Sequence, residues 1–264
     1  MRALLRAVCA AAVLSAPANV AADADSEGLA CLAPPFADPA SEREREVQAL
    51  VGWLRAALAP FGGLGRILED SPPEVCLAAY LFGAQGYVDA EARRVVIRAD
   101  LPPGLMRAVA IHELRHVEQV KRGTCPSEGL SMQATGRVVM AMEADASAVS
   151  LAVAWSLREA GDGAVWEALA AWPTHAKLAQ AFEAEMRGTG DVARATAAAF
   201  AAWYEDATLV ERTYVAACSG YLDRQDESHA LPRYGALDGG FFDDLCRLPG
   251  GEGYPCSEPE VARR

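Results

Sequence analysis

The segment from residue 103 to residue 122 constrains the fold of this chain more than any other segment. Pro102 and Pro103 stand at its start, where a helix tolerates proline because the N–H groups of the first turn have no partner within the helix. Gly123 stands at its end, where a left-handed residue commonly terminates a helix. The sequence therefore predicts one long helix between these boundaries.

Two of the chain's four histidines lie one turn apart in this helix, because residues 112–116 read His-Glu-Leu-Arg-His. Each helical residue is rotated by about 100° from the last, so His112 and His116 point the same way. Leu105 and Val109 precede them on the same stripe, which predicts that both imidazoles face the interior of the fold. Two imidazole nitrogens placed in this way suit one zinc ion; the alternative is a pair of surface histidines.

A catalytic zinc site needs a third protein ligand and one open position. In the extended form of this motif, a glycine and a third histidine follow at the third and sixth places after the second histidine. Gln119 and Arg122 occupy those places here, which excludes that form. We expect the ligand to be Glu143, on a later predicted helix, although a solvated glutamate or a salt bridge between helices is the alternative. Its helical neighbours are small and would let two helices approach closely: Gly136, Ala146, Ser147 and Ser150.

With Glu143 downstream, the motif resembles that of the gluzincin branch of the zincin-type metallopeptidases, in which two histidines and a glutamate bind zinc. It is also similar to exported bacterial metallopeptidase domains in which a helical Glu-Ala-Asp-Ala segment follows, here Glu143 to Ala146. The resemblance covers about residues 75–160. It implies a zincin-like fold in which the edge of a small sheet lies beside the motif helix.

The resemblance implies an exported peptidase that acts on peptides or proteins. His112, His116 and Glu143 would bind one catalytic Zn²⁺, and Glu113 would act as general base toward a zinc-activated water. Hydrolysis of a non-peptide amide stays open. Two other classes are alternatives: a catalytically inactive zinc-binding envelope interaction module, and a disulfide-stapled helical structural protein in which the motif is accidental.

The residues that would support this chemistry are less evident. Many gluzincins carry an aspartate four residues after the ligand glutamate, but Ser147 stands there, so a partner for the histidines is not indicated. Asp145 is about 200° around the helix from that glutamate and is interpreted as a surface charge or an ion pair. Arg115 is expected to be solvated or paired with an acid. Candidates for stabilising an oxyanion, each with a structural alternative, are Tyr204, Tyr214, His175 and His229.

The remaining periodicity predicts an α+β fold that is mostly α: a small β-hairpin sheet packed beside the motif helix and further long helices. Strands are expected over 75–82, 86–88 and 94–98, the last two forming a hairpin. The strand over 94–98 is either an edge that pairs with an extended peptide or an ordinary sheet strand. Helices are expected over 41–59, 130–160, 164–171, 174–187 and 191–221, with loose segments at 23–41 and about 223–264.

Residues 1–22 are typical of an export signal, with Arg2 and Arg6 before the apolar run 7–16. A short membrane anchor is the alternative, but the run is roughly half the ~20 residues that a span needs. We therefore expect signal cleavage to leave a single domain, residues 23–264, that is periplasmic or secreted and not attached to the membrane. Nothing in the sequence indicates an oligomeric state.

The formal net charge of -12 argues against nucleic acid and anionic membranes as partners. Six cysteines follow the predicted signal, and an even number in an exported chain indicates disulfides. Cys246 and Cys256 are the most readily bridged pair, and Cys125 with Cys218 is a second expectation. A thiolate zinc site is the alternative, but the chain has no Cys-x-x-Cys pair.

Overall fold

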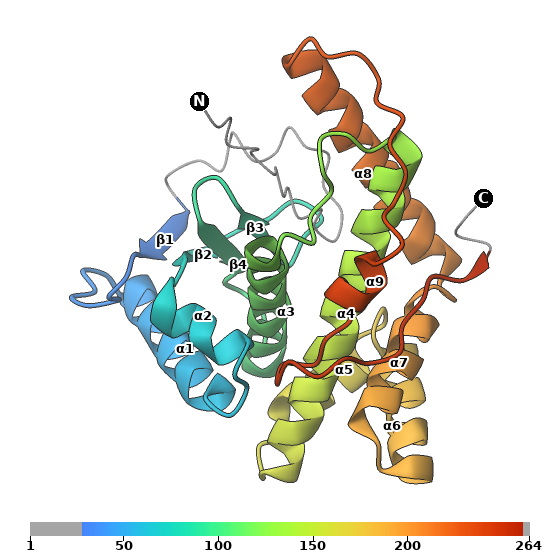
Figure 1. The fold of residues 1–264 in the computed structure, drawn as a ribbon. Helices are drawn as coiled ribbons and strands as arrows, with labels where there is room; N and C mark the ends of the chain where they lie inside the picture. The colour runs from blue at the N-terminus through green and yellow to red at the C-terminus, as the bar shows by residue number, and fades with distance from the viewer. Residues whose placement is uncertain (1–27, 261–264) are drawn as a thin grey trace.

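The computed structural model describes residues 28–260 (Figure 1), so the predicted signal over 1–22 lies outside the described residues. The described chain is α+β and mostly α, as predicted. Its strands are β1 (Leu29–Leu32), β2 (Glu74–Ala78), β3 (Gly86–Asp89) and β4 (Arg94–Arg98). Its helices are α1 (Glu42–Leu58), α2 (Leu64–Asp70), α3 (Pro103–Arg122), α4 (Met132–Glu159), α5 (Ala164–Ala171), α6 (Ala176–Thr189), α7 (Val192–Trp203), α8 (Ala207–Glu227) and α9 (Phe241–Leu245).

The four strands form one mixed sheet in the order β1-β2-β4-β3. The predicted hairpin is confirmed, because β3 pairs with β4 in antiparallel fashion, while β2 pairs with β4 in parallel. Of the two alternatives for residues 94–98, the sheet edge is wrong and the ordinary sheet strand is confirmed, because β4 lies between β2 and β3. Val95, Val96 and Ile97 are all buried, and such a continuous apolar run is typical of an internal strand. Within the described residues, β3 takes the edge position next to α3.

The first strand was missed, because residues 23–41 were expected to be loose. β1 has only four residues and pairs with β2, where a disulfide joins Cys31 to Cys76. The two joined cysteines are 45 residues apart in the sequence, so no local pattern predicts this strand. The predicted strand over 75–82 ends at Ala78, and the exposed side chains of Tyr80 and Phe82 follow in a loop.

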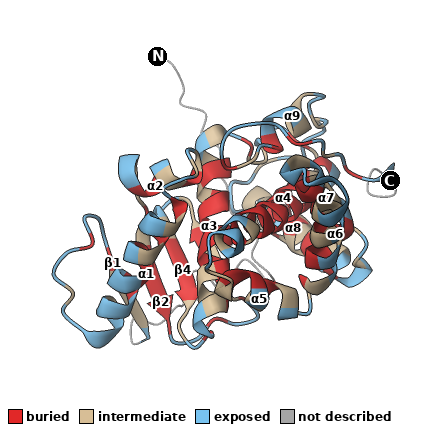
Figure 2. Ribbon diagram, turned by 90° about the horizontal axis from the view of Figure 1, so that it is seen from below, coloured by how far each residue is buried: buried red, intermediate tan, exposed pale blue. Residues whose placement is uncertain are grey.

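Helices enclose the sheet on the face that carries the main core. α1 begins at the predicted cap, where Ser41 Oγ accepts a hydrogen bond from the Glu44 N–H at 3.1 Å. α3 lies between the sheet and α4, and both helices are largely buried (Figure 2). α4 is long and apolar enough to cross a membrane by length and composition alone, yet 94% of its most apolar window is buried inside the fold. It is therefore the central helix of the core, with α3, α5, α7 and α8 packed around it.

The C-terminal third contains more regular structure than predicted. The single helix expected over 191–221 is two helices, because Asp206 begins α8 by accepting a hydrogen bond from the Leu209 N–H at 3.0 Å. α8 runs to Glu227, beyond the expected start of the loop-rich tail, and α9 lies within that tail. The disulfide between Cys246 and Cys256 is present as expected.

The expected bridge between Cys125 and Cys218 is wrong, since Cys218 is a free thiol. Its side chain is hydrogen-bonded to Tyr214, one turn earlier on α8. The Cys218 sulfur therefore contacts a residue of its own helix and not another cysteine.

Candidate metal centre

Helices α3 and α4 bring His112, His116 and Glu143 together at the centre of the fold. The two imidazole Nε2 atoms are 3.1 Å apart. Glu143 places one carboxylate oxygen 3.4 Å from His112 Nε2 and the other 3.4 Å from His116 Nε2. The three residues are at most 7% exposed, so they converge in a site that is nearly closed to solvent.

These spacings fit a zinc ion. Ligand atoms about 2.0–2.1 Å from a tetrahedral zinc lie roughly 3.3–3.4 Å from one another. The 3.1 Å between the two nitrogens, and the 3.4 Å from each nitrogen to a different oxygen of the Glu143 carboxylate, are each close to the edge length of such a tetrahedron. Two imidazoles and one carboxylate are also a donor set that zinc prefers.

The charges of His116 and Glu143 are coupled. Burial favours a neutral imidazole, but the carboxylate of Glu143 outweighs it and raises the pKa of His116 to about 9. Burial likewise opposes the charge on Glu143, yet the two histidines lower its pKa to about 2. These shifts favour an imidazolium–carboxylate pair in the metal-free protein, and a divalent cation would replace the proton.

The small residues expected to let α3 and α4 approach do not all serve that purpose. Ala146, Ser147 and Ser150 are buried in the core. Gly136 instead faces α8, because a β-carbon there would lie 2.4 Å from the ring of Tyr214. Gly136 lies nearly two turns before Glu143, and at that level the helix packed against it is α8 and not α3.

Glu113 and His112 line a common cavity between α3, α5 and the loop before β3. Burial is the main reason that the pKa of Glu113 is raised; the nearby histidines lower it and Glu143 raises it further. A carboxylate with a raised pKa holds a proton more readily, which suits a general base. The cavity is lined by Gln85, Leu105, Ala108, Val109, His112, Glu113, Ser150, Leu169, Trp172 and His175.

Of the four oxyanion candidates, His175 is the one that lines this cavity in the described structure. Burial, with a smaller effect of His112, lowers the pKa of His175 to about 3, so its ring is neutral at physiological pH. The other three lie elsewhere. Tyr204 is partly buried near Glu258, Tyr214 packs against α4, and His229 is exposed after α8.

Gln119 is the partner of His116 that the sequence did not indicate: its Oε1 lies 2.7 Å from His116 Nδ1. The only available signal was its place three residues after His116, on the same side of the helix. Of the two interpretations of Asp145, the surface charge is wrong and the ion pair is confirmed. Asp145 is fully buried and ion-paired to Arg115, which is also fully buried. The reason is that α4 is enclosed on all sides, so even a residue about 200° away from Glu143 faces the interior.

Of three comparisons with known proteins, one finds a match. No curated protein and no solved structure matches the chain. A family model does match, over residues 19–256. That stretch includes α3, α4 and all the residues of the candidate centre. The chain therefore belongs to the family described as "Putative metallopeptidase family (DUF6782)".

Proposed function

We propose that the protein is an exported zinc-dependent peptidase of the gluzincin kind. His112, His116 and Glu143 would be its metal ligands and Glu113 its general base. The observation that supports this most strongly is the spacing of the three ligand groups within a buried site: the two imidazole Nε2 atoms lie 3.1 Å apart, and each lies 3.4 Å from one oxygen of the Glu143 carboxylate. Family membership supports a metallopeptidase role independently of that geometry.

The residues of the chain would divide the chemistry as follows. A bound zinc ion supplies Lewis acidity, which activates a water molecule and polarises the scissile carbonyl. Glu113 accepts the proton of the attacking water and delivers it to the leaving amine. Neutral His175 donates a hydrogen bond to the oxygen on which negative charge develops. Thr174 Oγ1 lies 3.0 Å from His175 Nδ1, and a hydroxyl that donates there leaves the Nε2–H group as the donor.

The substrate would be a peptide or protein in extended form. β3 is at the edge of the described sheet, and an edge strand offers backbone groups to an added strand. Gly86, the first residue of β3, packs directly against Glu113. A peptide paired with β3 would therefore pass close to the general base.

The decisive experiment measures the metal content of residues 23–264, with disulfides intact, by elemental mass spectrometry beside a His116→Ala variant. We expect about one zinc per chain in the wild type, as one site of this kind holds one ion, and a loss of that zinc in the variant. A wild-type protein that retains no metal after zinc addition and dialysis would contradict the proposal. It would leave a helical disulfide-containing protein with a coincidental motif.

Export is tested separately. Cell fractionation combined with N-terminal sequencing of the recovered protein should find it outside the cytoplasm and beginning near Asp23. A cytoplasmic protein that begins at Met1 would contradict the localisation and leave the proposed chemistry untouched.

A further inference from the structure

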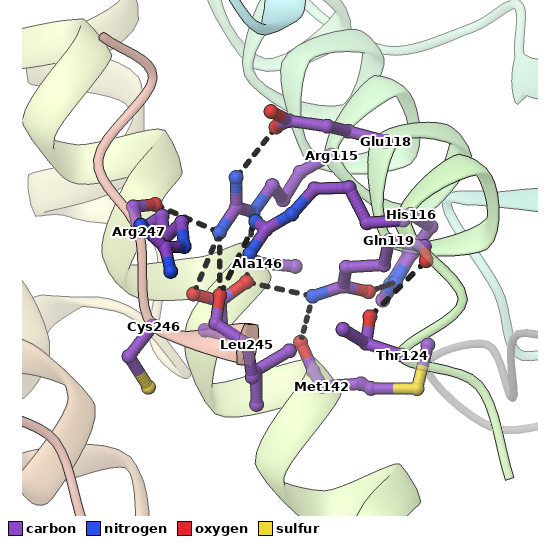
Figure 3. A network of polar contacts seen from close by, with 12 residues as sticks. Arg115, His116, Glu118, Gln119, Thr124, Met142, Ala146, Leu245, Cys246 and Arg247 are labelled. Atoms are coloured by element: carbon purple, nitrogen blue, oxygen red, sulfur yellow. Dashed lines mark hydrogen bonds and ion pairs between the residues drawn. The ribbon is translucent and has the colours of Figure 1, made fainter. Parts of the chain in front are cut away.

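We infer that Gln119 and Asp145 are positioning residues for the metal ligand His116, and that they connect it to the C-terminal part of the chain. This inference rests on the proposed zinc site. It concerns a continuous buried network from His116 to a segment that we call the C-terminal strap, residues 245–254 (Figure 3).

The orientation of the Gln119 amide is determined by its neighbours. Its Nε2 lies 3.0 Å from the backbone oxygen of Met142 and 2.7 Å from Asp145 Oδ2. Both are acceptors, so the NH₂ group must face them and Oε1 must face His116. The oxygen then accepts a hydrogen bond from His116 Nδ1–H at 2.7 Å. With the proton held on Nδ1, the Nε2 lone pair is directed to the metal, as a histidine ligand requires.

Asp145 holds this amide in place, because its carboxylate is itself fixed by three other hydrogen bonds. Arg115 donates from Nε to Oδ2 at 2.7 Å and from Nη2 to Oδ1 at 3.0 Å. Tyr254, on the strap, donates its hydroxyl to Oδ1 at 2.7 Å. Each carboxylate oxygen thus accepts two hydrogen bonds, and neither can turn away from Gln119 without breaking a buried contact.

Arg115 ties the same network to the strap a second time. Its Nη2 donates to the backbone oxygens of Leu245 at 3.1 Å and Arg247 at 2.8 Å. The remaining nitrogen, Nη1, pairs with Glu118. A fully buried guanidinium in which each of the three nitrogens has a partner is held firmly, so the strap, Asp145 and Gln119 form one unit behind His116.

The test compares zinc affinity and metal-free stability in two variants of the same residue. Gln119→Met keeps the size of the side chain and removes its hydrogen bonds. It should weaken zinc binding by roughly 10–100-fold, the usual effect of losing such a partner. Gln119→Glu keeps an oxygen facing His116 but places a second carboxyl group beside Asp145. It should hold zinc within a few-fold of the wild type although its metal-free form unfolds at lower temperature.

A second pair of variants tests the link to the strap without touching the metal site. Tyr254→Phe removes only the hydroxyl that donates to Asp145 and should weaken zinc binding measurably, though less than Gln119→Met. Tyr221→Phe is the matched control. That buried hydroxyl accepts a hydrogen bond from the Arg233 N–H at 2.9 Å and has no link to His116.

The measurement is the zinc dissociation constant by chelator competition, with thermal unfolding of each metal-free protein. An unchanged constant in Gln119→Met, or equal weakening in the Met and Glu variants, would overturn the positioning role and leave the peptidase proposal standing. A Tyr254→Phe protein with the affinity of Tyr221→Phe would overturn the link to the strap. Absence of zinc from the wild type itself would defeat the proposed function, and this inference with it.

Discussion

Gly86 and Glu113 are in such close contact that no side chain fits between them. A β-carbon at position 86 would lie 3.0 Å from Glu113 Oε1 and 2.7 Å from Val109 Cγ1. Both distances are shorter than ordinary van der Waals contact, so the strand edge and the general base share one small space. The position of Glu113 therefore depends on a glycine in a different element.

Replacement of this glycine should separate metal binding from catalysis. Gly86→Ala would push either β3 or the Glu113 side chain aside, while the three ligands keep their places on α3 and α4. We expect zinc affinity to stay unchanged and peptide hydrolysis to fall by about 100-fold, the effect of misplacing a catalytic group by an ångström. Gly52→Ala is the control, because a β-carbon at position 52 meets nothing within 4 Å.

Glu113→Gln should strongly reduce turnover without loss of metal. The amide has nearly the same shape but cannot accept the water proton, so kcat should fall by about 10²–10⁴-fold, the usual contribution of a general base. Zinc content and hydrolysis are measured on the same preparation. A wild type that binds zinc but matches the Glu113→Gln protein in all peptide assays would support an inactive zinc-binding module instead.

His175 should act on the transition state and not on the metal. His175→Leu removes a buried donor from the cavity and should lower kcat by about 10²–10³-fold, as loss of an oxyanion donor does. His175→Gln, which retains an N–H donor, should recover part of that loss. Equal kinetics for His175→Leu and the wild type would show that the ring only fills space.

Zinc binding should release protons, because the pKa of His116 is raised to about 9 while that of Glu143 is lowered to about 2. At pH 7 the imidazolium must lose its proton before Nε2 can bind a cation, so about one proton should leave per zinc. Zinc affinity should therefore rise from pH 6 to pH 9. Calorimetry in buffers of different ionisation enthalpy measures the number of protons released per zinc. Release of no proton would mean that His116 is already neutral before zinc binds.

The sequence was informative where chemistry depends on local spacing. The direction shared by His112 and His116 follows from the helical repeat alone, and the closeness of Glu143 follows from one pairing of helices. The roles of Gln119 and Asp145 depend on which surfaces meet. Asp145 binds Arg115 across 30 residues and Tyr254 across 109, and no periodicity encodes such contacts.

The same distinction explains the errors in the fold. The cap at Ser41 and the proline and glycine boundaries of α3 are local signals, and both helices begin and end as expected. β1 depends on a partner strand far along the chain, and the internal position of β4 depends on β2 returning beside it. The order of strands in a sheet depends on tertiary packing, so the residues of one strand do not determine which strands pair with it.

The C-terminal strap also has a consequence for synthesis. Ribosomes make residues 245–254 after every ligand of the candidate centre, and two backbone oxygens of that segment and the Tyr254 hydroxyl complete the hydrogen bonds of Arg115 and Asp145. A product that stops before the strap would still contain His112, His116 and Glu143. It would leave a buried guanidinium and carboxylate with unfilled hydrogen-bonding positions behind the metal ligands. The centre thus depends on a segment that is synthesised after all of its ligands.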